Sequence, residues 1–206
     1  MSNDGHPAVF LDRDGTLNEE VGFVNHPDRF IVYPWAAEAV SLLNQAGFAA
    51  VVLTNQSGVA RDYFSEEMVE LCHRKLREEI ARGGGSLAGI YYCPHHPEGR
   101  VEAYRRNCRC RKPDTGMIER AVQELELDLS RSYVVGDRYL EVEMARRAGL
   151  PSIFVLSGYG RGEYEYRRQT WPHMPSMVAP DVLAAAKEIV RAVGAHGRAP
   201  LGNGSS

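Results

Sequence analysis

Short, mainly apolar runs alternate with amphipathic stretches along this chain. Runs with the length of buried strands occupy residues 8–11, 48–53, 87–92, 133–137 and 152–156. Apolar side chains recur at helical spacing in residues 35–46, 65–80, 114–127, 144–148 and 181–193. Strands that alternate with helices in this way predict a parallel, doubly wound (Rossmann-like) α/β sheet.

The remaining segments lack this periodicity. Gly, Asn and Pro residues make residues 18–34 an irregular loop that is too short to form a separate domain. Residues 157–180 form a long connection, and in a compact domain such a connection is either functional or mobile. We expect a single domain over residues 1–193, followed by a disordered tail rich in Gly and Ser over residues 194–206.

Composition narrows the class of protein. A chain of 206 residues with ordinary apolar and charged fractions is typical of one soluble domain. Its formal net charge of -3 supplies no basic field for nucleic acid, and no apolar run is long enough to span a bilayer. The first residues lack the basic start and apolar core of a signal peptide, so we expect a cytoplasmic protein.

Two acids follow the first predicted strand, at the edge where parallel sheets bind ligands. Gly15 lets the backbone turn, so the carboxylates of Asp12 and Asp14 would crowd into one pocket. Crowded carboxylates suit a hard cation such as Mg²⁺, and one of them could attack a phosphoryl group while the other donates a proton. The competing interpretation is an ordinary strand-end turn, because Asp-Gly is a common turn dipeptide.

Polar residues also occur near the ends of other predicted strands. Thr54 and Asn55 follow the second strand, Arg111 and Lys112 precede a helix, and Asp137 ends the fourth strand. The strand ends at one edge of an α/β sheet converge, so these positions can build one site. Taken alone, Lys112 would more often be a solvated surface lysine.

A second cluster contains soft metal ligands. Its members are Cys93, His95, Cys108 and Cys110. Three thiolates and an imidazole satisfy tetrahedral Zn²⁺, and four protein ligands close the coordination shell, which predicts a structural zinc that staples the loop 93–110. The alternatives are unrelated core cysteines, or His96 as the fourth ligand. Cys72 lies on an apolar helical stripe and is predicted to be a core residue.

Four motifs in this order resemble the haloacid dehalogenase phosphatases. They are Phe-Leu-Asp-Arg-Asp-Gly-Thr-Leu, Thr-Asn-Gln-Ser-Gly, Cys-Arg-Lys-Pro and Val-Gly-Asp-Arg. The resemblance implies that Asp12 is the nucleophile and Asp14 the general acid and base. It further implies that Asp12, the backbone carbonyl of Asp14 and Asp137 hold Mg²⁺, while Thr54 and Lys112 bind the transferred phosphoryl group.

The Cys-Pro-His-His-Pro and Cys-x-Cys motifs narrow the resemblance to the zinc-containing branch of this superfamily, over about residues 8 to 193. The function that this branch implies is removal of the 7-phosphate from a heptose 1,7-bisphosphate in surface-glycan synthesis, by a monomer acting on a small phosphorylated sugar. The implied substrate contacts are Glu20, Val21, Gly22, Phe23, Thr54, Asn55, Gln56, Ser57, Arg111, Lys112 and Arg138. The alternatives are a histidinol-phosphate phosphatase and a zinc-stapled interaction module on an inactive phosphatase fold.

The chain departs from the family pattern at a few positions. Glu141 stands where Asp is usual, which affects how a metal ion or its waters are held, and Asp62 stands where Gly is usual. The segments between the motifs leave no room for a cap domain, so we expect an open site. Basic groups such as Arg109, Arg111 and Arg138 would then hold a second phosphate.

Overall fold

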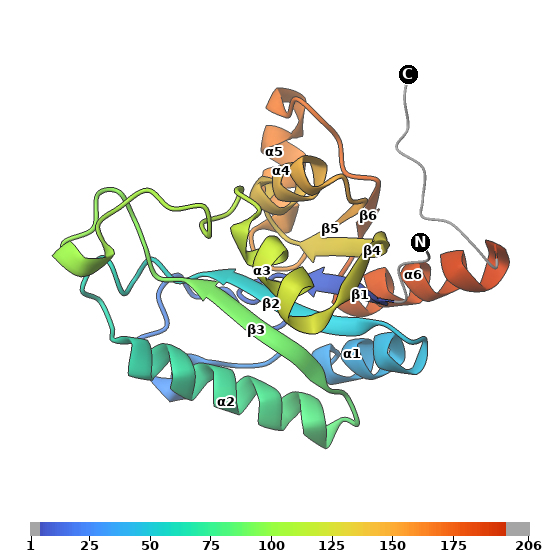
Figure 1. Ribbon diagram of the computed structural model, residues 1–206, viewed down its shortest axis with the longest axis horizontal. Coiled ribbons are helices and arrows are strands. Elements are labelled where there is room, and N and C mark those ends of the chain that lie inside the picture. The colour runs from blue at the N-terminus through green and yellow to red at the C-terminus, as the bar shows by residue number, and fades with distance from the viewer. Residues whose placement is uncertain (1–4, 197–206) are drawn as a thin grey trace.

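The computed structural model describes residues 5–196, in which a parallel sheet lies between two layers of helices (Figure 1). The strands are β1 (His6–Leu11), β2 (Ala49–Asn55), β3 (Leu87–Cys93), β4 (Leu127–Gly136), β5 (Ser152–Val155) and β6 (Met177–Ala179). The α-helices are α1 (Ala36–Gln45), α2 (Glu66–Arg82), α3 (Gly116–Leu125), α4 (Tyr139–Ala148), α5 (Gly160–Arg167) and α6 (Val182–His196). The strand order β3-β2-β1-β4-β5-β6 confirms the predicted doubly wound α/β fold.

Alternate residues of β1 supply the two cores of the molecule. Val9 and Leu11 pack in the core that α1, α2 and α6 cover, whereas Ala8 and Phe10 pack with α3 and α4 on the other face. Successive side chains of a strand point to opposite faces, so a continuous apolar run is what a strand covered on both sides requires. Cys72 of α2 is buried in the first core, as predicted.

The predicted connection over residues 157–180 contains regular structure. Helix α5 and the short strand β6 lie within it, and β6 pairs with β5 at the sheet edge. Trp171 anchors the segment, with its ring centroid 5.1 Å from that of Tyr139 and 5.0 Å from that of Phe154. The segment is therefore a packed part of the domain.

Two other element bounds differ from the predictions. Strand β4 begins at Leu127, where the sequence predicts the end of a helix, because Leu127 and Asp128 pair with the first residues of β1. Helix α6 continues through His196, beyond the predicted domain end at residue 193. The rest of the predicted tail, residues 197–206, lies outside the described residues.

The strand ends determine where the functional residues lie. Asp12 follows β1, Thr54 is the second-last residue of β2, Cys93 ends β3 and Asp137 follows β4. All five strand pairings are parallel, so these ends lie at the same edge of the sheet. The loop that follows β3 extends from this edge at the left of Figure 1, in green and yellow-green.

Neither insertion near this edge is a cap domain. Between β1 and α1 the described chain forms one 3₁₀ turn (Pro27–Arg29), and between β3 and α3 it forms another (Glu102–Tyr104). No helix within residues 5–196 has the length and apolar character needed to cross a membrane.

Candidate active site and metal cluster

A pocket of about 230 Å³ opens at the carboxyl edge of the sheet. Every predicted catalytic and substrate-binding residue except Val21 lines it. The lining also includes Gly58, Phe64, Leu140, Glu141 and Tyr159, which the sequence did not assign to substrate. Asp137 does not line the pocket and is fully buried.

The Asp12 carboxylate is held by two hydrogen bonds. Its Oδ1 accepts from the Lys112 Nζ at 2.6 Å and from the Arg13 backbone N–H at 2.7 Å. The Lys112 ammonium also donates to the Leu53 carbonyl at 3.0 Å and lies 2.7 Å from Glu141 Oε1. Lys112 is thus a buried cation between two carboxylates rather than a surface lysine.

Burial and charge have opposite effects on the pKa values of this pair. Burial raises the pKa of Asp12 to about 7, although the Lys112 ammonium acts to lower it. Burial acts to lower the pKa of Lys112, but Asp12 and Glu141 outweigh it and raise that pKa. Lys112 is therefore charged, and Asp12 is stabilised as a carboxylate only with cations close by.

Asp12, Asp137 and Glu141 form a buried acidic cluster whose oxygens lie within 4.8 Å of one another. Burial, together with the charges of Asp12 and Glu141, raises the pKa of Asp137 well above its ordinary value. Asp137 Oδ2 accepts from the Tyr159 N–H at 2.8 Å, whereas Oδ1 is buried without a hydrogen-bond partner among the described residues. A cluster of desolvated oxygens with one unpartnered atom fits a divalent, oxygen-binding cation.

The Asp14 side chain turns away from this cluster toward Arg13. Arg13 Nη2 lies 2.8 Å from both carboxylate oxygens, and Asn18 and Gln56 donate at 3.0 and 2.8 Å. Burial acts to raise the pKa of Asp14, but the Arg13 guanidinium and these hydrogen bonds outweigh it and lower the pKa. Arg13 is itself 1% exposed and its guanidinium lies 5.2 Å from the Phe30 ring centroid.

Residues at the end of β2 connect the two acids to Lys112. Gln56 Nε2 donates to Thr54 Oγ1 at 2.9 Å, so the Thr54 hydroxyl keeps its own proton for another acceptor. The Asn55 amide accepts from the Lys112 N–H at 3.1 Å and donates to the Lys112 carbonyl at 3.3 Å. Asn55 therefore fixes the backbone from which the Lys112 ammonium reaches Asp12.

Basic and acidic side chains face each other at the mouth of the pocket. Arg111 Nη1 donates to the His95 carbonyl at 3.3 Å, which ties this arginine to the cysteine loop. Glu20 and Arg138 both line the pocket, and burial raises the pKa of Glu20 although the charge of Arg138 acts to lower it. Arg109, which was predicted to face the same site, instead pairs with Glu119 at 2.8 Å and does not line this pocket.

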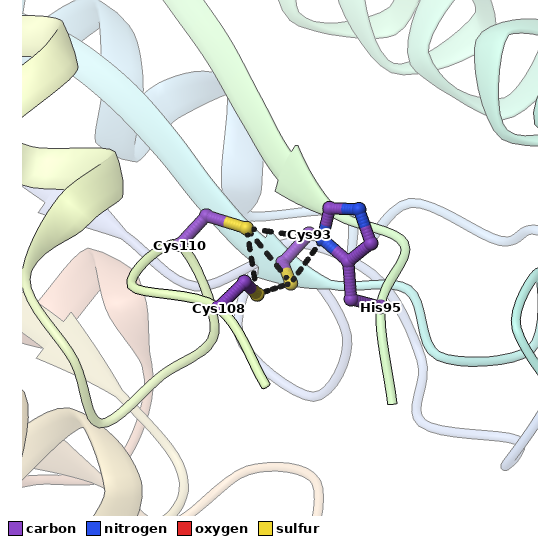
Figure 2. Close-up of side chains that lie close together, drawn as sticks. All are labelled: Cys93, His95, Cys108 and Cys110. Atoms are coloured by element: carbon purple, nitrogen blue, oxygen red, sulfur yellow. Dashed lines mark hydrogen bonds between the residues drawn. The ribbon is translucent and has the colours of Figure 1, made fainter. Parts of the chain in front are cut away.

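The four predicted zinc ligands converge (Figure 2). The Cys93 Sγ lies 3.4 Å from Cys108 Sγ and 3.1 Å from Cys110 Sγ, and the Cys108 and Cys110 sulfurs are 3.0 Å apart. Figure 2 shows the His95 ring with Nδ1 turned toward the sulfurs, 3.3 Å from Cys110 Sγ and 3.7 Å from Cys93 Sγ. Each of these cysteines is free, so the cluster is not held by a disulfide.

The cluster has the chemistry of a soft-metal site. Its hydrogen bond with Cys93 lowers the pKa of the Cys110 thiol to about 5, so a thiolate is available at neutral pH. His96, the alternative ligand, lies apart from the sulfurs and has its Nε2 3.0 Å from Arg61 Nη2. The geometry thus selects His95 among the two candidate histidines.

Several residues of the site were not predicted from the sequence. Ser157 Oγ donates to the Gly15 carbonyl at 2.6 Å, and Gly158 lies so close that a Cβ there would come within 2.3 Å of Asp137 Oδ2. The signal that could have found them is their place directly after a buried parallel strand, at the edge that carries the other site residues. No pattern in the sequence indicates that the Arg13 guanidinium would pair with the Asp14 carboxylate.

Comparisons with known proteins agree with this geometry. Residues 109–185 match the HAD-hydrolase-like family model. A D-glycero-D-manno-heptose-1,7-bisphosphate 7-phosphatase of Thermosynechococcus vestitus is 42% identical over 191 residues, which cover 89% of this chain and 95% of the relative. A D-glycero-beta-D-manno-heptose-1,7-bisphosphate 7-phosphatase of Escherichia coli K12 is 44% identical over 153 residues, covering 74% of this chain and 80% of the relative.

A solved structure shows the same similarity. The crystal structure of the D,D-heptose 1,7-bisphosphate phosphatase of B. bronchiseptica, complexed with magnesium and phosphate, superposes with a TM-score of 0.79. It is 32% identical and covers 90% of this chain and 99% of its own. The similarity thus extends over most of this chain and most of each of these proteins.

Proposed function

The chain belongs to the family of D-glycero-D-manno-heptose-1,7-bisphosphate 7-phosphatases, within the haloacid dehalogenase superfamily, and we propose that it hydrolyses the 7-phosphate of such a heptose bisphosphate. The observation that carries the proposal is the environment of Asp12. This buried carboxylate lies at the floor of an open pocket, bonded to Lys112 and within the acidic cluster. A nucleophilic carboxylate that must approach a phosphate needs such cationic partners.

The acidic cluster is the proposed site of Mg²⁺. Asp12, Asp137 and the backbone carbonyl of Asp14 would hold the ion, with Glu141 as a further carboxylate of the cluster. When bound, the ion supplies positive charge that offsets the repulsion between the nucleophile and the phosphoryl oxygens. The unpartnered Asp137 Oδ1 and the raised pKa values of Asp12 and Asp137 support this fit.

In the first step an oxygen of Asp12 attacks phosphorus and the bond to the sugar oxygen breaks, which leaves an aspartyl-phosphate. Hydrogen bonds from Lys112 and from the Arg13 N–H fix the plane of the Asp12 carboxylate for this attack. The Lys112 ammonium and the Thr54 hydroxyl bind phosphoryl oxygens as charge develops on them.

Asp14 manages the proton in both steps. To give a proton to the leaving sugar oxygen, Asp14 must first take one up, which the negative charge of the entering phosphate favours. It then takes a proton from the water that attacks the aspartyl-phosphate, which releases phosphate, restores Asp12 and leaves Asp14 protonated for the next cycle. Asn18 and Gln56 hold its carboxylate beside the pocket, and the Arg13 guanidinium stabilises its ionised form for the second step.

The non-reacting part of the substrate would lie toward the mouth of the pocket. Glu20, Gly22 and Phe23 line the pocket together with residues 54–57, which lie next to the acids. Arg111 and Arg138 would bind the phosphate that is not transferred, which favours a bisphosphate over a monophosphate.

We further propose that the cysteine cluster holds one structural Zn²⁺. Three sulfurs and one imidazole nitrogen fill the tetrahedral shell that zinc prefers, which leaves no position for substrate. The ion would tie the loop 93–110 to the end of β3 and so place Arg111 against the pocket. Since its thiols must stay reduced, the protein would work in the cytoplasm, as a monomer that supplies activated heptose for surface glycans.

The experiment that tests this function is phosphate release from the α and β anomers of heptose 1,7-bisphosphate and from histidinol phosphate, each with Mg²⁺ and with chelator. We expect Mg²⁺-dependent turnover with a higher kcat/KM for a heptose anomer. A preference for histidinol phosphate would move the assignment to that substrate, and Glu20 and Phe23 in the pocket are the residues that would bind it. Absence of turnover on every ester would favour an inactive interaction module.

A further inference from the structure

Arg138 is held from one side by the segment that follows β5. Its Nε donates to Glu163 Oε1 at 3.2 Å, and its guanidinium carbon lies 5.2 Å from the Tyr159 ring centroid. The Arg138 side chain is 44% exposed and lines the pocket, whereas that of Glu163 is 12% exposed. Arg138, which is half-exposed and lines the pocket, is thus paired with the nearly buried carboxylate of Glu163.

Both oxygens of Glu163 are engaged with residues adjacent to the acidic cluster. Oε1 accepts from Arg138, and Oε2 accepts from the backbone N–H of Tyr139 at 2.9 Å. Tyr139 is the first residue of α4, so Glu163 also satisfies a free N–H at a helix N-terminus, where negative charge is favourable. The carboxylate therefore has one defined orientation.

The start of α5 is also held in place by close contacts. Gly160 is buried so close to β5 that a Cβ there would come within 1.9 Å of the Val155 carbonyl oxygen. The Tyr159 N–H donates to Asp137 Oδ2, which ties the segment to the acidic cluster. The backbone at the start of the helix that carries Glu163 is therefore tied to β5 and to the acidic cluster.

We propose that Glu163 is a positioning residue, which holds Arg138 by Nε so that the Nη groups of the guanidinium bind the non-reacting phosphate of the substrate. An arginine presents its donors in a rigid fork, so occupying Nε on one side leaves the two Nη groups for a bidentate contact on the other. This inference rests on the proposed function, because it requires a substrate with a second phosphate.

Holding Arg138 in one orientation before substrate binds lowers the entropy cost of binding. A free arginine samples many rotamers and must lose that freedom when it binds an anion, whereas Glu163 and Tyr159 restrict Arg138 before substrate arrives. The contact of Glu163 is made at Nε, which leaves the edge formed by the two Nη groups for an anion. The restriction should therefore improve binding of the second phosphate without affecting the chemistry at Asp12.

The test is the Glu163→Gln variant, assayed with heptose 1,7-bisphosphate and with heptose 7-phosphate, which lacks the second phosphate. The amide can still accept from the Tyr139 N–H, but its NH₂ group opposes the Arg138 Nε donor. We expect KM for the bisphosphate to rise about tenfold while kcat stays within about twofold. KM for the monophosphate should stay within about twofold of the wild-type value.

A matched control and a double variant exclude a merely structural role. Glu165 lies on the same helix, is exposed and pairs with Arg161 at 3.7 Å, so Glu165→Gln should leave both substrates unaffected. In an Arg138→Met background, adding Glu163→Gln should have no further effect on KM for the bisphosphate.

The outcomes separate this inference from the function on which it rests. Absence of wild-type turnover on the bisphosphate would overturn the proposed function. Wild-type turnover with an unchanged KM in Glu163→Gln, or an equal rise for both substrates, would overturn the role of Glu163 alone. A full additional effect of Glu163→Gln in the Arg138→Met background would do the same.

Discussion

At the scale of single residues, the site keeps its two acids in different electrostatic surroundings. Asp12 faces Lys112 and two other carboxylates, and its pKa is raised to about 7. Asp14, two residues later, faces the Arg13 guanidinium, and its pKa is lowered. Two carboxylates from one short motif can thus serve different roles because their neighbours differ.

The motif residues could be predicted from the sequence, but their partners could not. Asp12, Asp14, Thr54, Lys112 and Asp137 stand at strand ends or in recognisable motifs, and all reach one place. Arg13 and Glu163 act through contacts that depend on rotamers and on packing of distant segments, which one sequence does not encode in any spacing.

Replacement of the proposed nucleophile tests the residue-scale chemistry. Asp12→Asn keeps the side-chain shape and an oxygen that can accept from Lys112, but it removes the attacking carboxylate. We expect kcat to fall by on the order of 10⁴-fold or more, with little change in melting temperature. Asp28→Asn, the same change at an exposed side chain, is the control for phosphate release. Unchanged turnover in Asp12→Asn would rule out the aspartyl-phosphate route.

Glycine at position 158 gives a second residue-scale prediction. Its φ is +54°, and a Cβ there would meet Asp137 Oδ2 at 2.3 Å and the Gly15 Cα at 2.5 Å. Gly158→Ala should therefore displace Asp137 and lower kcat/KM on the order of 100-fold, measured in steady-state assays. Gly162→Ala, in α5 with open space around it, should preserve activity and stabilise by up to about 1 kcal/mol. Equal effects of the two substitutions would contradict this.

At the scale of elements, the long connection after β5 shows where sequence periodicity fails. Helix α5 has only eight residues, contains Gly160 and Gly162, and of its residues only Gly160 is fully buried. Strand β6 has three residues, which is too short to show an alternating pattern. By contrast, α1, α2 and α6 each bury several apolar residues in the core and were predicted within a few residues of their bounds.

The cysteine loop is the element whose stability should depend on metal. Cys110→Ser removes one of the four predicted ligands, so we expect zinc content to fall from about one ion per chain to near zero. The melting temperature should fall and KM should rise, because Arg111 is anchored to His95 of this loop. Metal content is measured by elemental analysis of the purified protein.

The remaining cysteine supplies a matched control for the loop. Cys72 is a residue of α2 that is buried in the hydrophobic core and is not part of the cysteine cluster. Cys72→Ala should therefore leave the zinc content unchanged. A wild-type protein that binds no metal, or a Cys110→Ser variant that retains it, would refute the zinc assignment.

At the scale of the whole molecule, one sheet edge carries the entire active site. Five strand pairings in parallel register bring residues from position 12 to position 163 together, and no inserted domain within the described residues covers the pocket. The residues that we propose to decide specificity therefore come from the core domain itself: Glu20, Gly22 and Phe23, Arg111 beside the cysteine loop, and the segment at the start of α5.

Global stability should depend on pH through His73 of α2. Burial lowers its pKa from 6.5 to about 3, and its Nε2 has no hydrogen-bond partner among the described residues. Between these two pH values His73 binds a proton in the unfolded chain but not in the folded protein, so the contribution of His73 to stability falls as the pH drops below 6.5. The raised pKa values of Asp12 and Asp137 act in the opposite direction, so the effect of His73 is measured as a difference between variant and wild type. Between about pH 7.5 and pH 5, this group should remove on the order of 2 kcal/mol from the free energy of unfolding.

Urea denaturation at both pH values measures this effect. The His73→Gln variant should lose less stability on acidification than the wild type, by about that amount. His26→Gln, at an exposed position, should follow the wild type. Identical pH dependence in His73→Gln and wild type would show that another group controls acid stability.

Because β1 lies between β2 and β4 in the sheet, the active site can form only late in synthesis of the chain. Asp12, directly after β1, is held by β4, because its backbone N–H donates to the Val135 carbonyl at 2.9 Å. On the ribosome, β1 can pair with β2 early, but its other side stays an open edge until β4 has been synthesised. A nascent or truncated chain that ends before Leu127 therefore lacks both Asp137 and the strand that supports Asp12, and would not dephosphorylate a metabolite.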